Sequence, residues 1–375
     1  MTRKFAHEFY PGGANPVSGS QAELTVQEIE DAGLREVLQT PGAPIGSWSF
    51  LGDLLQPGEP FVFHEPLGQA REVKVALSGL FGRFVARAYL ERYCDLSVFH
   101  HLGQGPIQLS AARRISIIAN DEGDWPDWVA CTKAFSDLTL AEAKGTHDKA
   151  GPRPALSRAR KQVQRVDVVE QGRNVPVKRI AIATRWGVAT GGPSEPRISV
   201  HDPEDDGDPI DQEQKEAIFV GLFRHHTASM IARLGHAELA NAIRKLTEAS
   251  SRVAESQATD HARRLLEEGS DELSMSRDEY RVFRDSVGGI VTRAGPMTAA
   301  VASRLDLSQI EALDLRPVFI GIHKDVVGAA IEGDLKNIKQ ALILDKMAGP
   351  EPFRSDGAGS WIIPLDRSPE AGDET

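Results

Sequence analysis

The chain has 375 residues and 41% hydrophobic content, enough for two or three domains with real cores. Its formal net charge of -11 argues against a protein that coats polyanions indiscriminately, because such binding needs a summed positive field. Its two cysteines, Cys94 and Cys131, are too few and too far apart in sequence for a disulfide scaffold or a clustered zinc site. The cysteine usage, with no signal-like start and no run of about 18 apolar residues, predicts a globular cytoplasmic protein.

The first half of the chain divides at about residue 75. Residues 1–75 are rich in glycine and proline and carry only short apolar runs, which predicts a loop-rich N-terminal region. Residues 76–205 begin with an amphipathic pattern that predicts a helix ending near Tyr93. The apolar positions that define this helix are Leu80, Phe84, Ala88 and Leu90.

Strand patterns follow that helix. Residues 112–119 ("ARRISIIA") form a short β-branched run, and residues 126–145 ("PDWVACTKAFSDLTLAEAKG") contain two more candidate strands joined by a turn. The pattern becomes helical over residues 155–169 and returns to a buried strand over residues 177–186. The predicted order is therefore helix, strand, strand, strand, helix, strand.

The second half is expected to be mostly helical over residues 206–350. Residues 212–246 have the length and periodicity of one or two packed helices, and "RPVFIGIH" (residues 316–323) reads as an added strand. Residues 351–375 are expected to form a polar tail.

Positive charge is concentrated just after the residues "EAK" at 142–144. Between Arg153 and Arg185 there are nine basic residues against two acids, a local balance of +7. The basic residues are Arg153, Arg158, Arg160, Lys161, Arg165, Arg173, Lys178, Arg179 and Arg185. Such a segment could position phosphate groups, while the acidic surface elsewhere would oppose nonspecific binding.

The stretch from residue 126 to 145 brings charged residues together. A hairpin turning around Ala134 and Phe135 would place Asp127 opposite Glu142, because the two positions are symmetric about that turn. Strand alternation then puts Lys144 on the same face as Glu142. Two carboxylates that meet across a hairpin repel one another unless a cation or a proton lies between them.

A hard divalent ion such as Mg²⁺ suits this set of ligands, since it prefers carboxylate oxygen, backbone carbonyl and water. The expected protein ligands are the carboxylates of Asp127 and Glu142 and the carbonyl of Ala143. A metal held in this way would activate water and neutralise charge on a phosphodiester, and Lys144 could orient that water.

The motif resembles that of the PD-(D/E)XK nuclease superfamily. Pro126-Asp127 is followed after fourteen residues by Glu142-Ala143-Lys144, and the resemblance covers about residues 78–187. It implies an α/β fold with a restriction-endonuclease-like core, in which a mixed central sheet is flanked by helices. This core is followed here by the mostly helical C-terminal region.

The resemblance also implies roles for individual residues. Asp127 and Glu142 would bind Mg²⁺, with Mn²⁺ as an alternative, and Lys144 would assist the attacking water. Some members add a glutamine on the helix after the motif, for which Gln162 is preferred over Gln164. Others add a glutamate on the first helix, where Glu91, at the end of that helix, is the nearby candidate.

The expected function is that of a Mg²⁺-dependent nuclease. The resemblance favours DNA as the substrate and an endonuclease as the activity, with Arg158, Lys161 and Arg165 contacting phosphates. Defence against foreign DNA is a further hypothesis without direct support from the residues. The alternatives are a non-catalytic nucleic-acid-binding or interaction scaffold on the same fold, an RNA nuclease, and an ordinary surface hairpin with a Glu–Lys pair. Two other tripeptides of the same type, at residues 213–215 and 334–336, lie in helical patterns and lack the upstream Pro-Asp.

Overall fold

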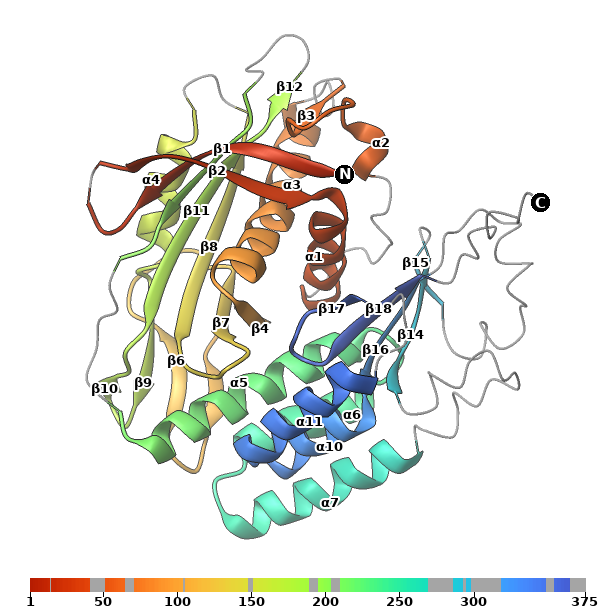
Figure 1. Cartoon of the computed structure of the whole chain (residues 1–375). Helices are drawn as coiled ribbons and strands as arrows, with labels where there is room; N and C mark the ends of the chain where they lie inside the picture. The colour runs from red at the N-terminus through yellow and green to blue at the C-terminus, as the bar shows by residue number, and fades with distance from the viewer. Residues whose placement is uncertain are drawn as a thin grey trace, which may run out of the picture.

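The computed structural model describes residues 1–13, 15–40, 51–64, 71–103, 105–147, 151–188, 195–203, 210–268, 286–292, 295–297, 318–348 and 354–364. The fold is mixed α/β, with a large mixed sheet flanked by helices and a smaller sheet packed with further helices (Figure 1). Within the described ranges, no helix combines the length and the apolar character needed to cross a bilayer.

Seven strands form the large sheet. Their order is β2 (Val17–Thr25), β1 (Thr2–Tyr10), β13 (Arg197–His201), β11 (Lys178–Arg185), β8 (Leu138–Thr146), β7 (Trp128–Thr132) and β4 (Leu96–His101). Strands β4, β7 and β8 form an antiparallel meander, and β11 lies parallel to β8. The sheet is therefore mixed, because β1 and β13 are also parallel while β13 is antiparallel to β11.

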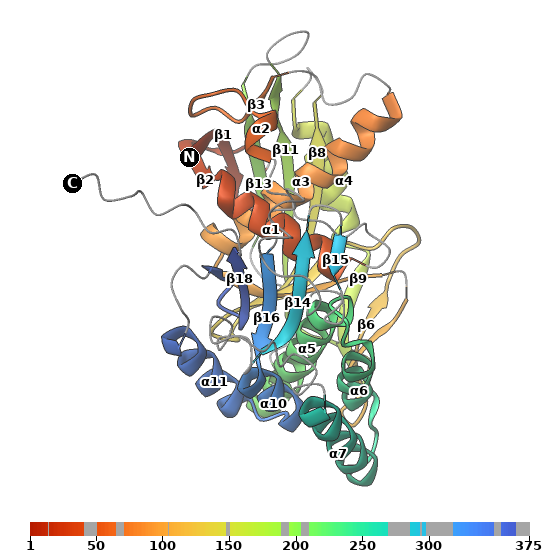
Figure 2. The same ribbon diagram turned by 90° about the vertical axis from the view of Figure 1, so that its right-hand side faces the viewer.

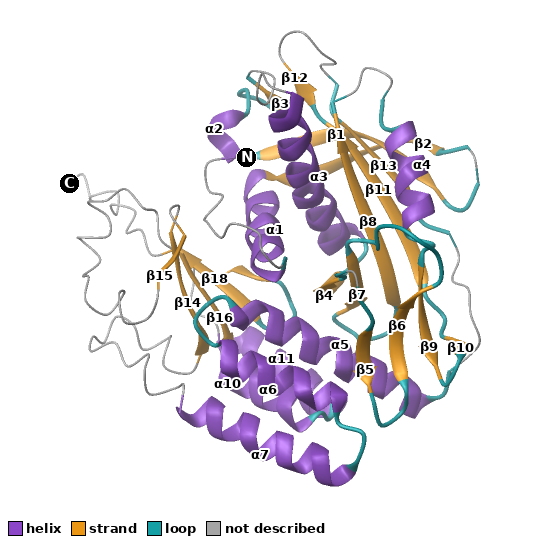
Figure 3. Cartoon of the chain, turned by 180° about the vertical axis from the view of Figure 1, so that it is seen from behind, coloured by secondary structure: helices purple, strands orange, loops and turns teal. Residues whose placement is uncertain are grey.

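Helices cover both faces of this sheet. Helix α3 (Arg71–Tyr93) and α1 (Val26–Gln39) lie on one face, and α4 (Arg153–Gln162) lies on the other (Figure 3). Strand β11 explains the arrangement, since successive side chains point to opposite faces. Ile180 and Ile182 join the main hydrophobic core, whereas Ala181 and Ala183 pack in a separate cluster with Leu156 of α4.

Two glycines let α3 approach β8 closely. A Cβ on Gly145 would lie 1.9 Å from the carbonyl oxygen of Ser78, and one on Gly82 would lie 2.5 Å from the Cα of Gly145. Neither position can hold a larger side chain unless the backbones separate. This contact places Arg83, which follows Gly82, beside the strand that carries Lys144.

Smaller strands complete the first part of the chain. A four-stranded sheet has the order β10 (Arg173–Asn174), β9 (Val166–Glu170), β6 (Ile115–Ala119) and β5 (Ile107–Ser110). Strands β12 (Gly187–Val188) and β3 (Val62–Phe63) form a parallel pair, and α2 (Leu51–Leu54) is a single turn.

The C-terminal part contains a five-stranded sheet (Figure 2). Its order is β15 (Gly295–Met297), β14 (Ser286–Thr292), β16 (Val318–His323), β18 (Ser360–Pro364) and β17 (Arg354–Ser355). The accompanying helices are α5 (Gln212–Ala232), α6 (Ala237–Glu248), α7 (Arg252–Glu268), α10 (Lys324–Glu332) and α11 (Leu335–Ala348).

Helix α1 contacts both parts of the molecule. Arg354 on β17 forms an ion pair of 2.8 Å with Asp31 of α1. Farther along α1, the amide of Gln39 donates to Ser229 of α5 at 3.0 Å and to the carbonyl of Phe99 on β4 at 2.8 Å. The helix therefore connects the two sheets through one partly exposed ion pair and the buried hydrogen bonds of Gln39.

Several predicted elements are confirmed. The first helix ends at Tyr93, and the two strands of residues 126–145 form a hairpin. Residues 115–119 form a strand, but it lies in the four-stranded sheet, and β4, which was not predicted, pairs with the hairpin instead. Residues 212–246 form two helices, and a strand occupies residues 318–323.

Other expectations are wrong. Residues 1–75 are not mainly loop, because they form β1, β2 and α1, and their glycines and prolines include the turn between the two strands. The helix expected over residues 155–169 ends at Gln162, and the alternating "VDVVE" sequence becomes β9. Residues 206–350 are mostly helical where they are described, as expected, but they include β14 and β15 besides the predicted strand β16. The expected polar tail contains β17 and β18, with Trp361 buried. Residues 365–375 lie outside the described ranges.

Candidate active site

The β7–β8 hairpin has the predicted register. Trp128 pairs with Ala141, so one more step along the ladder places Asp127 opposite Glu142. The turn includes Phe135, whose φ of 55° lies in the left-handed region that non-glycine residues seldom adopt. The prediction that the Pro-Asp step meets the "EAK" residues across a hairpin is confirmed.

Asp127 and Glu142 hold one another through the backbone. The Asp127 N–H donates to Oε2 of Glu142 at 2.9 Å, and the Ala143 N–H donates to Oδ2 of Asp127 at 2.9 Å. The ammonium group of Lys144 pairs with Oε1 of Glu142. The three predicted side chains therefore converge at the end of β8 where the hairpin opens.

The site faces α4 on one side of the sheet. Glu142 and Lys144 are in register with Ala181 and Ala183 of β11, and these alanines pack against α4. Neighbouring residues in register on parallel strands point to the same face, so the charged pair also points toward α4. The Glu142 side chain is fully buried, whereas that of Lys144 is 32% exposed.

Burial makes the charge on Glu142 unfavourable. Desolvation, together with the negative charge of Asp127, raises the pKa of Glu142 well above its usual range, although Lys144 opposes the shift. Oε1 of Glu142 accepts no hydrogen bond from the described residues, beyond its ion pair with Lys144. A divalent cation near these oxygens would favour the ionised form.

A backbone carbonyl is also available. The β7–β8 ladder ends at the pair of Trp128 and Ala141, so Ala143 lies beyond its last pair. Pro126, two residues before Trp128, has no N–H with which to continue the ladder. The Ala143 carbonyl is therefore kept as the expected third protein ligand.

The donor set fits a hard cation. It comprises two carboxylates and a carbonyl, the oxygen ligands that Mg²⁺ takes alongside water. Across the described part of the chain, no group of three or more His, Cys, Asp or Glu side chains could hold a metal ion, so water would complete the coordination.

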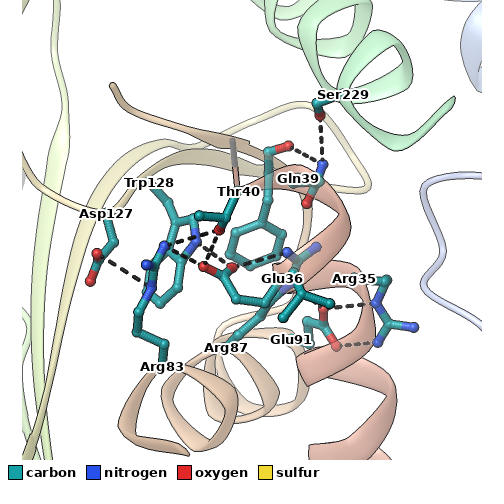
Figure 4. Close-up of polar contacts among 12 residues, drawn as sticks. Arg35, Glu36, Gln39, Thr40, Arg83, Arg87, Glu91, Asp127, Trp128 and Ser229 are labelled. Carbon is teal, nitrogen blue, oxygen red and sulfur yellow. Dashed lines mark hydrogen bonds and ion pairs between the residues drawn. The ribbon is translucent and has the colours of Figure 1, made fainter. Parts of the chain in front are cut away.

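Arginine 83 provides a second cation at the site (Figure 4). Its Nε lies 3.5 Å from Oδ1 of Asp127, and its Nη2 pairs with Oε1 of Glu36 on α1. Glu36 also accepts from the indole Nε1 of Trp128 at 2.7 Å and pairs with Arg87 at 3.3 Å. Burial alone would raise the pKa of Glu36, but the two guanidinium groups lower it below its usual value.

Comparisons with family models, with curated proteins and with solved structures found no match. The residues, their contacts and the resemblance of the motif are therefore the basis for proposing a function.

The other predicted residues lie in different surroundings. Gln162, at the end of α4, donates to the carbonyl of Trp125 at 2.7 Å, so its amide holds the segment before Asp127. Glu91 pairs with Arg35 and Arg87. These two arginines hold Glu91, the candidate named for the first helix, two helical turns beyond Arg83, so it is not among the residues that converge with Asp127 and Glu142.

The basic segment is divided between surface and interior. Arg158 and Lys161 are exposed on α4, and Arg165 donates to the carbonyl of Asp124 at 3.2 Å. Arg179 is buried and pairs with Asp167 at 2.6 Å, and the mostly buried Arg185 donates to the carbonyl of Glu195 at 2.8 Å. These last two arginines are structural, so the expectation that the whole segment positions phosphates is wrong for them.

The sequence-based prediction missed Arg83 and Glu36. Glu36 lies in the region expected to be loop-rich, although Thr25 and Glu28 form a capping box that marks the start of its helix. Arg83 lies on a predicted helix, but no local pattern indicates that its side chain reaches Asp127.

Proposed function

We propose that this chain is a Mg²⁺-dependent nuclease, with Mn²⁺ as an alternative metal. Its core would be restriction-endonuclease-like and comprise α3, β4, β7, β8, α4 and β11. The order of these elements supports the proposal: a helix, a three-stranded antiparallel meander, a second helix on the opposite face, and a strand parallel to the third. Strands β5, β6, β9 and β10 would be additions to that core.

One observation carries the proposal. Glu142 accepts from the Asp127 N–H, Asp127 accepts from the Ala143 N–H, and Lys144 pairs with Glu142, so the three side chains meet near the end of a buried strand. Burial and the charge of Asp127 raise the pKa of Glu142, so an ionised Glu142 destabilises the fold. Carboxylates with such perturbed pKa values cluster at functional sites.

Each residue has a chemical task in this proposal. Asp127, Glu142 and the Ala143 carbonyl would hold the metal, which when bound would lower the pKa of a coordinated water and neutralise charge on a phosphodiester. The partly exposed ammonium of Lys144 would donate to the attacking water and to the oxygens that gain negative charge. Arg158 and Lys161, exposed on the helix that covers this face, would contact flanking phosphates.

DNA is the proposed substrate, on the strength of the resemblance, and RNA is the alternative. The second candidate function is a non-catalytic interaction scaffold. The observation that favours it is the full burial of Glu142, which already has Lys144 as its partner. In that case Lys144 would only neutralise a buried carboxylate.

Cleavage assays separate these candidates. Wild-type protein is incubated with Mg²⁺ or Mn²⁺ and with duplex DNA, single-stranded DNA or transfer RNA, and the single-turnover rate is measured at saturating enzyme. Lys144→Ala should lower that rate by about 10² or more with little change in affinity, because the ammonium acts mainly in the transition state.

Lys215→Ala is the matched control. Lys215 ends the "EQK" sequence and is exposed on α5, so its removal should leave the rate unchanged. Wild-type protein that cleaves none of the three substrates, or a Lys144→Ala variant as active as wild type, would overturn the nuclease proposal.

A further inference from the structure

Arg83 stands beside the candidate metal site on the side opposite Lys144. Lys144 pairs with Glu142 and Arg83 approaches Asp127, so each carboxylate has a cation of its own. The two cations come from different elements, β8 and α3, which the glycine contact between Gly82 and Gly145 holds together.

Three contacts fix the guanidinium of Arg83 (Figure 4). Glu36 and the hydroxyl of Thr40, at 3.4 Å, hold Nη2, and the guanidinium carbon lies 5.6 Å from the centre of the Trp128 ring. Trp128 is itself oriented by its hydrogen bond to Glu36. A flexible arginine side chain is thereby held in one orientation, which lowers the entropy lost when it binds a ligand.

Within the described ranges, one nitrogen of this guanidinium has no partner. Nη1 of Arg83 makes no hydrogen bond or ion pair with the described residues, and the side chain is 21% exposed. Arg83 is not needed to neutralise Glu36, because Glu36 already pairs with the fully buried Arg87. Guanidinium groups bind phosphate oxygens with directed, charge-assisted hydrogen bonds.

We infer that Arg83 is a substrate-phosphate-binding residue of this site and that Glu36 is the residue that positions it. The inference rests on the proposed nuclease function. With Nε of Arg83 3.5 Å from Asp127, a phosphodiester that reaches the carboxylates lies within reach of this guanidinium. Arg83 donates hydrogen bonds to a phosphate oxygen there, and Glu36 holds the guanidinium group in its orientation.

Binding of duplex DNA tests the role of Arg83. Affinity is measured against salt concentration in a Lys144→Ala background with no divalent metal added, so that the DNA stays intact. Arg83→Met should weaken binding about tenfold and lower the log-log salt slope by roughly 0.9, since one phosphate contact is lost. Arg83→Lys keeps the charge and should retain the slope, but in the otherwise wild-type chain its single-turnover cleavage should be at least about tenfold slower.

Arg92→Met is the matched control. Arg92 lies on the same helix and also pairs with a glutamate of α1, Glu28, at 2.8 Å. It is exposed and nine residues from Arg83, so its loss should change neither slope nor rate. Thermal unfolding of each variant verifies that it is folded.

Glu36→Gln tests the positioning role. The charge of Arg83 is retained but its orientation is lost, so affinity should fall while the salt slope stays at the wild-type value. Wild-type affinity in this variant would make Glu36 a core ion-pair partner only.

The outcomes separate the two proposals. Wild-type protein that cleaves while Arg83→Met keeps the wild-type slope and affinity overturns the role of Arg83 and leaves the nuclease intact. If Arg83→Met does not fold, Arg83→Lys decides, and a wild-type cleavage rate in that variant overturns the inference. Wild-type protein without cleavage of any substrate overturns both.

Discussion

Two buried glutamates in this protein should respond in opposite ways to the same substitution. Glu142 and Glu36 both have fully buried or nearly fully buried side chains. Burial and Asp127 raise the pKa of Glu142, whereas Arg83 and Arg87, acting against burial, lower the pKa of Glu36. Glu142→Gln should therefore be tolerated in metal-free protein, and Glu36→Gln should not.

The expected magnitudes follow from the contacts. In Glu142→Gln the amide oxygen can still accept from the Asp127 N–H, and the pair lost involves a lysine that is one-third exposed. Such a pair contributes about 0 to 1 kcal/mol, and relief of the carboxylate repulsion offsets it, so stability should change by less than about 1 kcal/mol. Glu36→Gln leaves Arg87 buried without its carboxylate and should cost roughly 3 kcal/mol.

Urea denaturation without metal and thermal unfolding with added Mg²⁺ provide the measurements. Binding of the proposed metal should stabilise wild-type protein by about 2.7 kcal/mol at a free concentration of 100 times the dissociation constant. Glu142→Gln should lose most of this stabilisation, together with cleavage activity by about 10³-fold, equivalent to ~4 kcal/mol of activation free energy. A Glu142→Gln variant that gains the full Mg²⁺ stabilisation, or that loses as much stability as Glu36→Gln, would refute this reasoning.

Three further predictions concern DNA binding, packing and pH. Replacing both Arg158 and Lys161 with glutamine should lower the log-log salt slope for duplex DNA by about 1.8; an unchanged slope would mean that α4 faces away from the nucleic acid. Gly145→Ala should cost roughly 3 kcal/mol or more in urea denaturation, because the new Cβ would lie 1.9 Å from the carbonyl oxygen of Ser78, and a cost under about 1 kcal/mol would contradict the close contact. Burial raises the pKa of Glu30 from 4.5 to about 7, so its protonated form favours the folded state below pH 4.5 and this stability is lost as pH rises through 7. Unfolding free energies of Glu30→Gln should lack this decline, which amounts to at most about 3 kcal/mol, and an equally steep decline in the variant would rule out Glu30 as its source.

The positions of Asp127, Glu142 and Lys144 could be predicted from the sequence because they depend on one hairpin of neighbouring residues. Asp127 and Glu142 face each other because residues equally far from the turn of a hairpin lie opposite one another, and the turn includes Phe135 as expected. Lys144 follows from strand alternation alone. None of these residues needs a distant partner to define its place.

The parts that were missed depend on distant contacts or on competing local signals. Arg83 meets Glu36 and Asp127 only because α1 and β7 pack against α3, and sequence periodicity does not specify such partners. The strands near the C-terminus were obscured by polar neighbours, although Trp361 is buried there. Glycines and prolines near the N-terminus lie between strands, but a segment rich in these two residues has the composition of a loop.

The position of α1 between the two sheets bears on how this protein can be dissected. A fragment ending near residue 205 would contain all the residues of the candidate site but would lack Arg354, the partner of Asp31, and Ser229, which holds Gln39. The helix that carries Glu36 would then expose a face evolved for the protein interior. Such a fragment is expected to aggregate, so the proposed activity is better tested on a chain that keeps both sheets.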